Sequence, residues 1–162
     1  MRLLALSATA LLLSAGTALA APALVTVEVA PKLQKTFDKT YGQREAERLV
    51  AELKESVETR LAKTGAYADA RIELTLLDVK PNRPTFKQLT DTPGLSMQSF
   101  GIGGAAIEGR IVAADGAVTP VAYSWYESDI RDAYANWTWS DAEWTFDRFA
   151  GRLARGDQFA RR

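Results

Sequence analysis

Acidic side chains gather between residues 127 and 147, where Arg131 is the single opposing charge. The members are Glu127, Asp129, Asp132, Asp141, Glu143 and Asp147. Paired carboxylates carry out glycoside hydrolysis, and carboxylates with backbone carbonyls hold Ca²⁺. The segment has no D-x-[DN]-x-[DN]-G calcium loop, so we predict no metal site. Glu127, Asp129 and Asp132 are candidate acids of a hydrolase, but the sequence assigns no catalytic residue; Asp141 and Glu143 suit the N-terminus of a helix.

Aromatic side chains form a second group, because all four tryptophans lie between residues 125 and 144. Exposed aromatic rings stack on sugars or bind peptides, whereas buried rings form core. Trp125, Phe146 and Phe149 fall on predicted inward faces, so we expect them in the core. Tyr134 and Trp137 lie in a predicted connecting loop and are candidates for a binding surface.

Residues 101–106, Gly-Ile-Gly-Gly-Ala-Ala, match the loose G-x-G-x-x-A pattern of dinucleotide-binding loops. That chemistry needs a preceding strand and a following helix whose N-terminal amides bind pyrophosphate. Here a Pro-rich stretch precedes the glycines and a strand-like segment follows. We interpret the glycines as sites of tight turning or close backbone approach, and expect no cofactor.

The composition excludes several classes of site. The chain has 162 residues, with 20 basic and 20 acidic side chains, no Cys and no His. Its own residues therefore form no disulfide, no Cys/His zinc site, no Ser-His-Asp triad and no histidine switch. A formal net charge of zero argues against a nucleic-acid-binding protein. Catalysis would have to use carboxylates, Lys, Tyr or Ser, and we favour a protein that is not an enzyme.

Residues 1–20 are typical of a cleaved export signal. Arg2 gives a positive start, Leu3–Leu13 is apolar, and Ala18-Leu19-Ala20 supplies the small residues of the cleavage site. The apolar run is shorter than the roughly 20 residues of a spanning helix, and no Cys follows it to carry a lipid. We therefore expect a periplasmic or secreted protein with no membrane span after cleavage, in which residues 21–162 form one domain.

The elements that position these residues follow from periodicity. Alternating apolar residues predict strands at 24–29 and 71–79, and apolar steps of three and four predict an amphipathic helix over 44–63. Thr40 with Gln43 could cap this helix and Gly65 could end it, while its charged face is interpreted as solvated.

A long Pro-rich stretch over 80–104 disfavours both helix and central strand. Loops of this length in compact domains are either functional or disordered, so this one is a candidate contact region. Its candidate binding residues are Arg83, Phe86 and Phe100.

Two strands, 105–114 and 118–127, are predicted to flank a two-residue turn at Asp115-Gly116, with Pro120 suited to an edge strand or to the start of a strand. A final helix starts at a capping box of Ser140 and Glu143, with Trp139 and Trp144 as a hydrophobic staple. The predicted fold is α+β: two helices packed on one small, mainly antiparallel or mixed sheet of about four strands, in the order β-α-β-loop-β-β-α.

Basic residues dominate the C-terminal end. Arg148, Arg152, Arg155, Arg161 and Arg162 face a lone Asp157. Positive charge near a helix C-terminus complements the helix dipole. Weak contact with an anionic lipid or glycan surface is the functional alternative, and salt would weaken it.

Three blocks carry a resemblance to known proteins: Lys80-Pro81-Asn82-Arg83-Pro84-Thr85, residues 99–105, and the Asp115-Gly116 hairpin with the terminal Trp/Phe helix. They resemble small uncharacterised exported proteins of Gram-negative bacteria. The order of elements is loosely similar to envelope lipoproteins of unknown function and to penicillin-binding-protein activator lipoproteins, whose α+β domains act by binding. This chain lacks their lipid-bearing Cys. The resemblance implies an interaction role and assigns no site residue.

Three functions remain open from the sequence. The first is a non-enzymatic periplasmic module that binds another envelope protein or a cell-wall glycan through the 80–104 loop and the aromatic loop near 134–139. The second is a carboxylate-dependent glycan hydrolase using Glu127, Asp129 or Asp132. The third is carbohydrate binding without catalysis through Trp137 and Tyr134.

Overall fold

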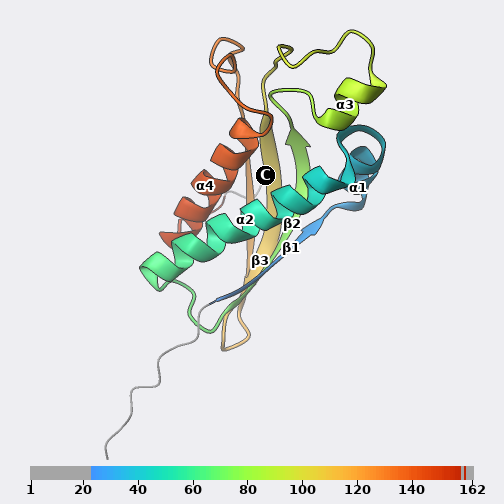
Figure 1. The fold of residues 1–162 in the computed structure, drawn as a ribbon. Coiled ribbons are helices and arrows are strands. Elements are labelled where there is room, and N and C mark those ends of the chain that lie inside the picture. The colour runs from blue at the N-terminus through green and yellow to red at the C-terminus, as the bar shows by residue number, and fades with distance from the viewer. Residues whose placement is uncertain (1–22, 158, 160–162) are drawn as a thin grey trace, which may run out of the picture.

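The computed structural model describes residues 23–157 and 159, so the predicted signal peptide and the last two arginines lie outside it. Figure 1 shows the elements in chain order. They are β1 (Leu24–Val29), α1 (Pro31–Thr36), the π-helix η1 (Phe37–Tyr41), α2 (Gln43–Thr64), β2 (Arg71–Lys80), α3 (Phe86–Asp91), β3 (Gly104–Val112), β4 (Val118–Tyr126) and α4 (Ser140–Ala154).

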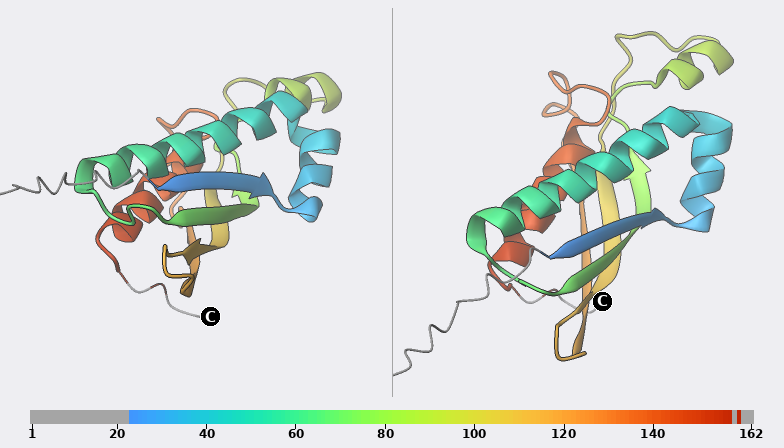
Figure 2. Two further views of the ribbon diagram at one scale, coloured as in Figure 1. Left: turned by 90° about the horizontal axis from the view of Figure 1, so that it is seen from below. Right: turned by 60° about the horizontal axis from the view of Figure 1, so that its bottom comes forward.

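The sheet has four strands in the order β1-β2-β3-β4. β1 pairs with β2 in parallel, and the other two pairs are antiparallel. The long helices α2 and α4 cover one face, and no helix within the described residues covers the other (Figure 2). The predicted α+β class and its mixed sheet are confirmed, with α1, η1 and α3 added.

The core lies between the sheet and the two long helices. Its largest fully buried side chains are Trp139, Phe37, Phe146, Phe149, Leu49, Leu53, Ile72, Leu76, Ile107 and Leu153. Apolar burial of this kind is the main favourable contribution to folding. Trp125 was expected here but is only half-buried, because it lies outside the core cluster under the guanidinium of Arg148, 4.1 Å from its ring centroid.

A β-bulge interrupts the alternation of β2 near its end. Leu76 pairs with Ile107, and Asp78 pairs with the next residue of β3, Ala106, so Leu77 is the extra residue. The shift returns Val79 to the buried face. This is the physical reason why the sequence pattern blurs at this point.

Helix α2 buries the predicted apolar stripe and ends at Gly65, whose φ of +67° and N–H bond to the Leu61 carbonyl (2.8 Å) confirm the predicted stop. The predicted cap at Thr40 and Gln43 is wrong. Gly42, with a φ of +99°, precedes the helix and no side chain caps it. Thr40 is part of η1, so its hydroxyl is not at the helix start.

Residues 31–41 form a helical connection that the sequence reading missed. Pro31 starts α1, where its fixed φ suits the first turn. Leu33 and Phe37 are buried in the core, and Phe37 and Tyr41 are in edge contact with ring centroids 5.8 Å apart. α1 and η1 are both too short to show a periodic apolar pattern.

The stretch 80–104 contains more regular structure than predicted. β2 extends to Lys80, β3 starts at Gly104, and α3 occupies 86–91, so the expectation of no helix is wrong. Thr85 Oγ1 accepts from the Gln88 N–H (3.3 Å) while Gln88 Oε1 accepts from the Thr85 N–H (3.1 Å). With this capping box, Thr85 is the N-cap residue of α3. Pro84 precedes the cap and lies outside the helix, so it does not prevent the helix from forming.

The turn between β3 and β4 is longer than predicted, so the two-residue turn is wrong. The Ala113 N–H donates to the Ala117 carbonyl, and the Gly116 N–H donates to the Ala113 carbonyl, both at 2.9 Å. Gly116 has a φ of +86°. A three-residue loop with glycine in the left-handed region satisfies this geometry.

Pro120 lies on the edge strand, as predicted. The Glu127 N–H donates to the Gly103 carbonyl and the Ala113 N–H to the Ala117 carbonyl, so odd-numbered residues of β4 face the ladder with β3. The missing N–H of Pro120 therefore faces away from β3, and no ladder bond is lost.

Gly103 and Gly104 confirm the interpretation of close backbone approach. A Cβ on Gly103 would lie 2.7 Å from Asn82 Oδ1, and a Cβ on Gly104 would lie 2.3 Å from the Trp125 carbonyl oxygen. Gly104 also has a φ of +145°. A side chain at either position would clash where the loop enters the sheet.

Candidate functional site

Two loops, residues 81–103 and 127–139, lie at the same end of the sheet, at the top of Figure 1. They expose seven large apolar side chains, which we call the apical surface. Its members are Phe86, Met97, Phe100, Ile102, Ile130, Tyr134 and Trp137. Trp137, Phe86 and Tyr134 are the most exposed, at 80, 79 and 71%. Four of the five predicted binding residues belong to this surface.

Arg83, the fifth predicted residue, ties the two loops together. Its guanidinium donates to the carbonyls of Asn136 (2.6 Å), Tyr134 (2.6 Å) and Met97 (3.1 Å). A planar guanidinium with several donors is suited to bridging carbonyls of separate segments. Arg83 therefore positions the surface, because its hydrogen bonds go to the protein's own backbone.

Phe100 and Tyr134 bring the loops into direct contact. Their ring centroids are 5.7 Å apart and the rings stand at 85°. Edge-to-face contact is a favourable arrangement of aromatic pairs, but it is not the coplanar row expected of a sugar-stacking platform. The arrangement favours an irregular apolar surface.

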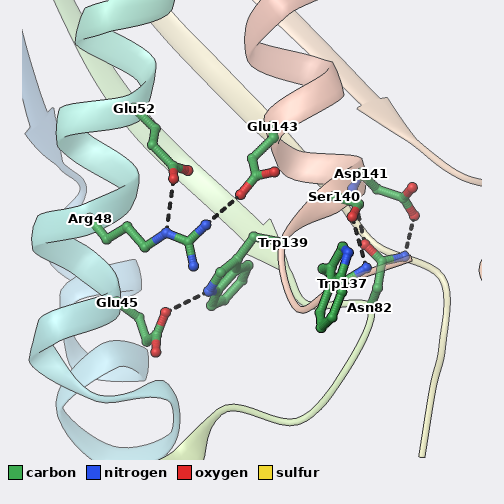
Figure 3. Close-up of polar contacts among 9 residues, drawn as sticks. All are labelled: Glu45, Arg48, Glu52, Asn82, Trp137, Trp139, Ser140, Asp141 and Glu143. Atoms are coloured by element: carbon green, nitrogen blue, oxygen red, sulfur yellow. Dashed lines mark hydrogen bonds and ion pairs between the residues drawn. The ribbon is translucent and has the colours of Figure 1, made fainter. Parts of the chain in front are cut away.

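A buried polar network lies beneath the apical surface. Asp141, 0% exposed, accepts hydrogen bonds from Asn82 Nδ2 (2.5 Å), the Gly103 N–H (2.8 Å) and Asn136 Nδ2 (2.8 Å). Asn82 Oδ1 in turn accepts from the Asp141 N–H at 3.0 Å (Figure 3). A buried carboxylate is tolerated when hydrogen bonds satisfy its oxygens. This network joins both loops to the start of α4.

The sequence reading missed this network. Asn82 lies in the predicted loop, and Asp141 was assigned only a favourable charge at a helix N-terminus. The Pro-Asn-Arg-Pro sequence around Asn82 signals a rigid turn, but the partner is 59 residues away. Pairing across that separation is visible only in the folded chain.

The start of α4 differs from the prediction. Trp139 precedes the helix without a side-chain cap, and Ser140 Oγ instead accepts from the Trp137 N–H at 2.8 Å (Figure 3). The capping box is therefore wrong. The positions assigned to the staple are wrong as well, because Trp139 is itself the residue at the N-cap and not the one before it; Trp139 is buried and Trp144 is 45% exposed. Trp139 donates instead to Glu45 of α2, with 2.7 Å between Nε1 and Oε2.

A polar seam joins α2 to α4, so the charged face of α2 is not simply solvated as predicted. Arg48 donates from Nε to Glu52 and from Nη2 to Glu143, both at 2.8 Å (Figure 3). Partial burial, and then the nearby charge of Glu52, raise the pKa of Glu143. Glu52 Oε2 is buried without a hydrogen-bond partner.

Two of the acids proposed for hydrolysis form hydrogen bonds to groups of their own loop. Glu127 Oε1 accepts from the N–H groups of Ser128 (2.7 Å) and Asp129 (3.0 Å). Hydrogen bonds from Arg131 lower the pKa of Asp129, the opposite of what a general acid needs. Asp132 is exposed.

The basic C-terminal residues within the described chain are also in contact with protein groups. Arg155 and Arg152 pair with Asp157 at 2.8 and 3.7 Å. Arg152 also lies over the ring of Tyr123, with 5.5 Å to its centroid. These contacts neutralise part of the positive charge there.

Residues 23–157 and 159 contain neither a membrane-spanning helix nor a cluster of metal ligands. No helix there is long and apolar enough to cross a membrane. No group of three or more His, Cys, Asp or Glu side chains there is arranged to hold a metal ion.

Comparison with known proteins gives distant likenesses. No family model and no curated protein matches the chain. It is similar to a minor lipoprotein from Acinetobacter baumannii, with 12% identity over 85% of this chain and 91% of that one and a TM-score of 0.36. It is also similar to a Caulobacter crescentus protein assigned to the lipoproteins, with 16% identity over 82% of each chain and a TM-score of 0.27. At these TM-scores the likenesses carry no information about function.

Proposed function

We propose that the protein is a non-enzymatic binding module of the cell envelope, acting in the periplasm after export. It binds another envelope component through the apical surface. The observation that carries this proposal is the concentration of seven exposed apolar side chains on two loops at one end of the sheet. Large exposed apolar surface on a protein of this size is typical of interaction sites.

The loops are held in place independently of a partner. Arg83 joins them at their exposed side, and Asp141 joins them at their buried side. A pre-organised surface loses less conformational entropy on binding. The buried network therefore supports a binding role as well as stability.

The two alternatives have less support. Glu127 accepts hydrogen bonds within its own loop, the pKa of Asp129 is lowered, and Asp132 is exposed, so none of the three has the buried setting that raises the pKa of a general acid. Sugar binding would use a platform of parallel rings, whereas Phe100 and Tyr134 are nearly perpendicular.

Site-specific photo-crosslinking in the envelope of the host tests the proposal. A photoreactive phenylalanine analogue replaces Trp137, Phe86 or, as a matched control, Val118, which is 57% exposed at the other end of the sheet. We expect discrete adducts from positions 137 and 86 and none from position 118. Equal adducts at 118, or the absence of adducts with protein and with lipid at positions 137 and 86, would reject the apical surface as the binding site.

A further inference from the structure

We propose that the apical surface docks on the interface of a lipid bilayer whose headgroups carry no net charge. This inference rests on the proposed function and names the partner of the same surface. The protein is then peripheral: it lies on the membrane by its loop tips, and its helices and sheet stay in the aqueous phase.

The apical surface contains side chains of the types that are found at membrane interfaces. Trp137 and Tyr134 belong to the residue types enriched at membrane–water interfaces, where an apolar ring body and a polar edge are both accommodated. Phe86 and Met97 add purely apolar groups from the other loop. The same types on the core-facing side of a helix would be ordinary, but here they face solvent.

The three most exposed side chains of the apical surface project far into solvent. Trp137, Phe86 and Tyr134 keep 71 to 80% of their surface exposed, so most of each side chain projects into solvent, although Tyr134 also contacts Phe100. A protein interface concentrates its affinity in well-packed central pockets with matching shapes. A fluid lipid interface requires no matching shape, so projecting single side chains suit it better.

Within the described residues, the two loops of the apical surface carry no positive charge without a partner. Each cation of the two loops already has a partner there: Lys87 pairs with Asp91 at 2.6 Å, Arg131 pairs with Asp129, and Arg83 donates to carbonyls. No excess positive charge remains to attract an anionic surface. Docking is therefore driven by apolar burial, which salt does not weaken.

Vesicle partitioning tests the inference. The protein used begins at Ala21, because the apolar run of residues 3–13 would bind lipid by itself; the described core starts at Val25. The probe is large unilamellar vesicles of phosphatidylcholine, at low and high salt. We expect partitioning at both salt concentrations, and about a tenfold loss of the partition coefficient for Trp137→Ala, from the apolar area no longer buried.

Matched variants localise the contact. Phe86→Ala should reduce partitioning to a similar extent, and Val118→Ala and Leu24→Ala, which shorten exposed aliphatic side chains at the other end, should leave it unchanged. With lipids brominated near the headgroup, quenching of tryptophan fluorescence should be lost in Trp137→Phe and kept in Trp139→Phe, whose ring is buried.

Several outcomes overturn the inference. They are no partitioning into phosphatidylcholine, binding only to anionic vesicles and only at low salt, or equal losses in the Val118 and Leu24 variants. Adducts of position 137 with a protein, without partitioning into vesicles, would reject the lipid and leave the proposed function standing. Partitioning without crosslinks to protein supports the lipid as the partner.

Discussion

The two ends of the sheet differ in how their connections are held. The apical end carries two long loops whose seven exposed apolar side chains face solvent, and long-range hydrogen bonds from Arg83, Asn82 and Asp141 fix them. The other end has the turn at 113–117, which is closed by bonds between near neighbours such as Ala113 and Ala117.

The difference shows what an exposed apolar loop needs. A short turn satisfies its backbone groups locally, with glycine at a positive φ. A long loop that keeps its apolar side chains in solvent cannot be held by burying them, so polar groups beneath it must do so. The buried Asp141 is the centre of that support.

The largest expected effect is at Asp141. Asp141→Ala removes the acceptor of three hydrogen bonds, although Asn82 Nδ2 keeps its bond to the Gly101 carbonyl (3.1 Å), so we expect the free energy of unfolding to fall by about 4 kcal/mol. Chemical denaturation measures it, and hydrogen exchange should accelerate in both apical loops but not in the turn at 113–117.

Asp147→Ala is the control, because Asp147 is exposed on the same helix. A loss below about 1 kcal/mol for Asp141→Ala would show that the network is not what holds the apical end.

A pair of glycine substitutions compares the two ends directly. Gly104→Ala places a methyl group 2.3 Å from the Trp125 carbonyl and should cost about 3 kcal/mol. Gly116→Ala meets no atom within 4 Å and bears only the strain of its positive φ, about 1 kcal/mol. Thermal and urea unfolding measure the loss in free energy of unfolding for both variants. Equal losses would contradict the proposed difference between the two ends of the sheet.

The seam between α2 and α4 gives a pH-dependent prediction. The raised pKa of Glu143 means that its ionised form costs stability at neutral pH, and that this cost fades as the pH falls through the raised pKa. Glu143→Gln can also donate to Glu52 Oε2. We expect Glu143→Gln to raise the free energy of unfolding at pH 7 by less than about 1 kcal/mol, because solvent screens the site.

The gain should shrink as the pH falls toward 4, because protonation of Glu143 removes the charge whose ionised form costs stability in the folded protein. Glu47→Gln, at an exposed position of α2 that does not affect the pKa of Glu143, serves as the comparison. A gain from Glu143→Gln that is constant from pH 7 to pH 4 would mean that the titration of Glu143 does not contribute.

The smallest effect on stability is expected at the apical surface itself. Trp137→Ala and Phe86→Ala should change the free energy of unfolding by no more than about 0.5 kcal/mol, since both side chains are about four-fifths exposed. Denaturation curves that overlay that of the unchanged protein would separate the binding surface from its support. A loss above about 1 kcal/mol would show that these rings contribute to the fold.

Much of the fold was predictable because its signals are local. The apolar stripe of α2, the alternation of β1 and the glycine after α2 each depend on neighbouring residues. The exposed positions of Tyr134 and Trp137 followed in the same way, from a loop without an apolar period.

Several errors occur where the folded chain gives a group a different hydrogen-bond or strand partner from the one that the local sequence predicts. Ser140 has the sequence of a cap but accepts from Trp137, while Asn82 accepts from the amide of Asp141. The register shift at Leu77 depends on pairing with β3. Short elements such as α1 and α3 carry too few residues to show a period.

The sequence by itself determined the α+β class, the two long helices and the loops that contain exposed aromatic residues. These depend on periodicity and on backbone preferences of single residues, which act over a few positions. Only the tertiary structure decided that the two loops meet at one end, that Arg83 joins them and that Asp141 supports them from below. Those contacts join residues 38 to 59 positions apart, and only folding of the whole chain brings them together.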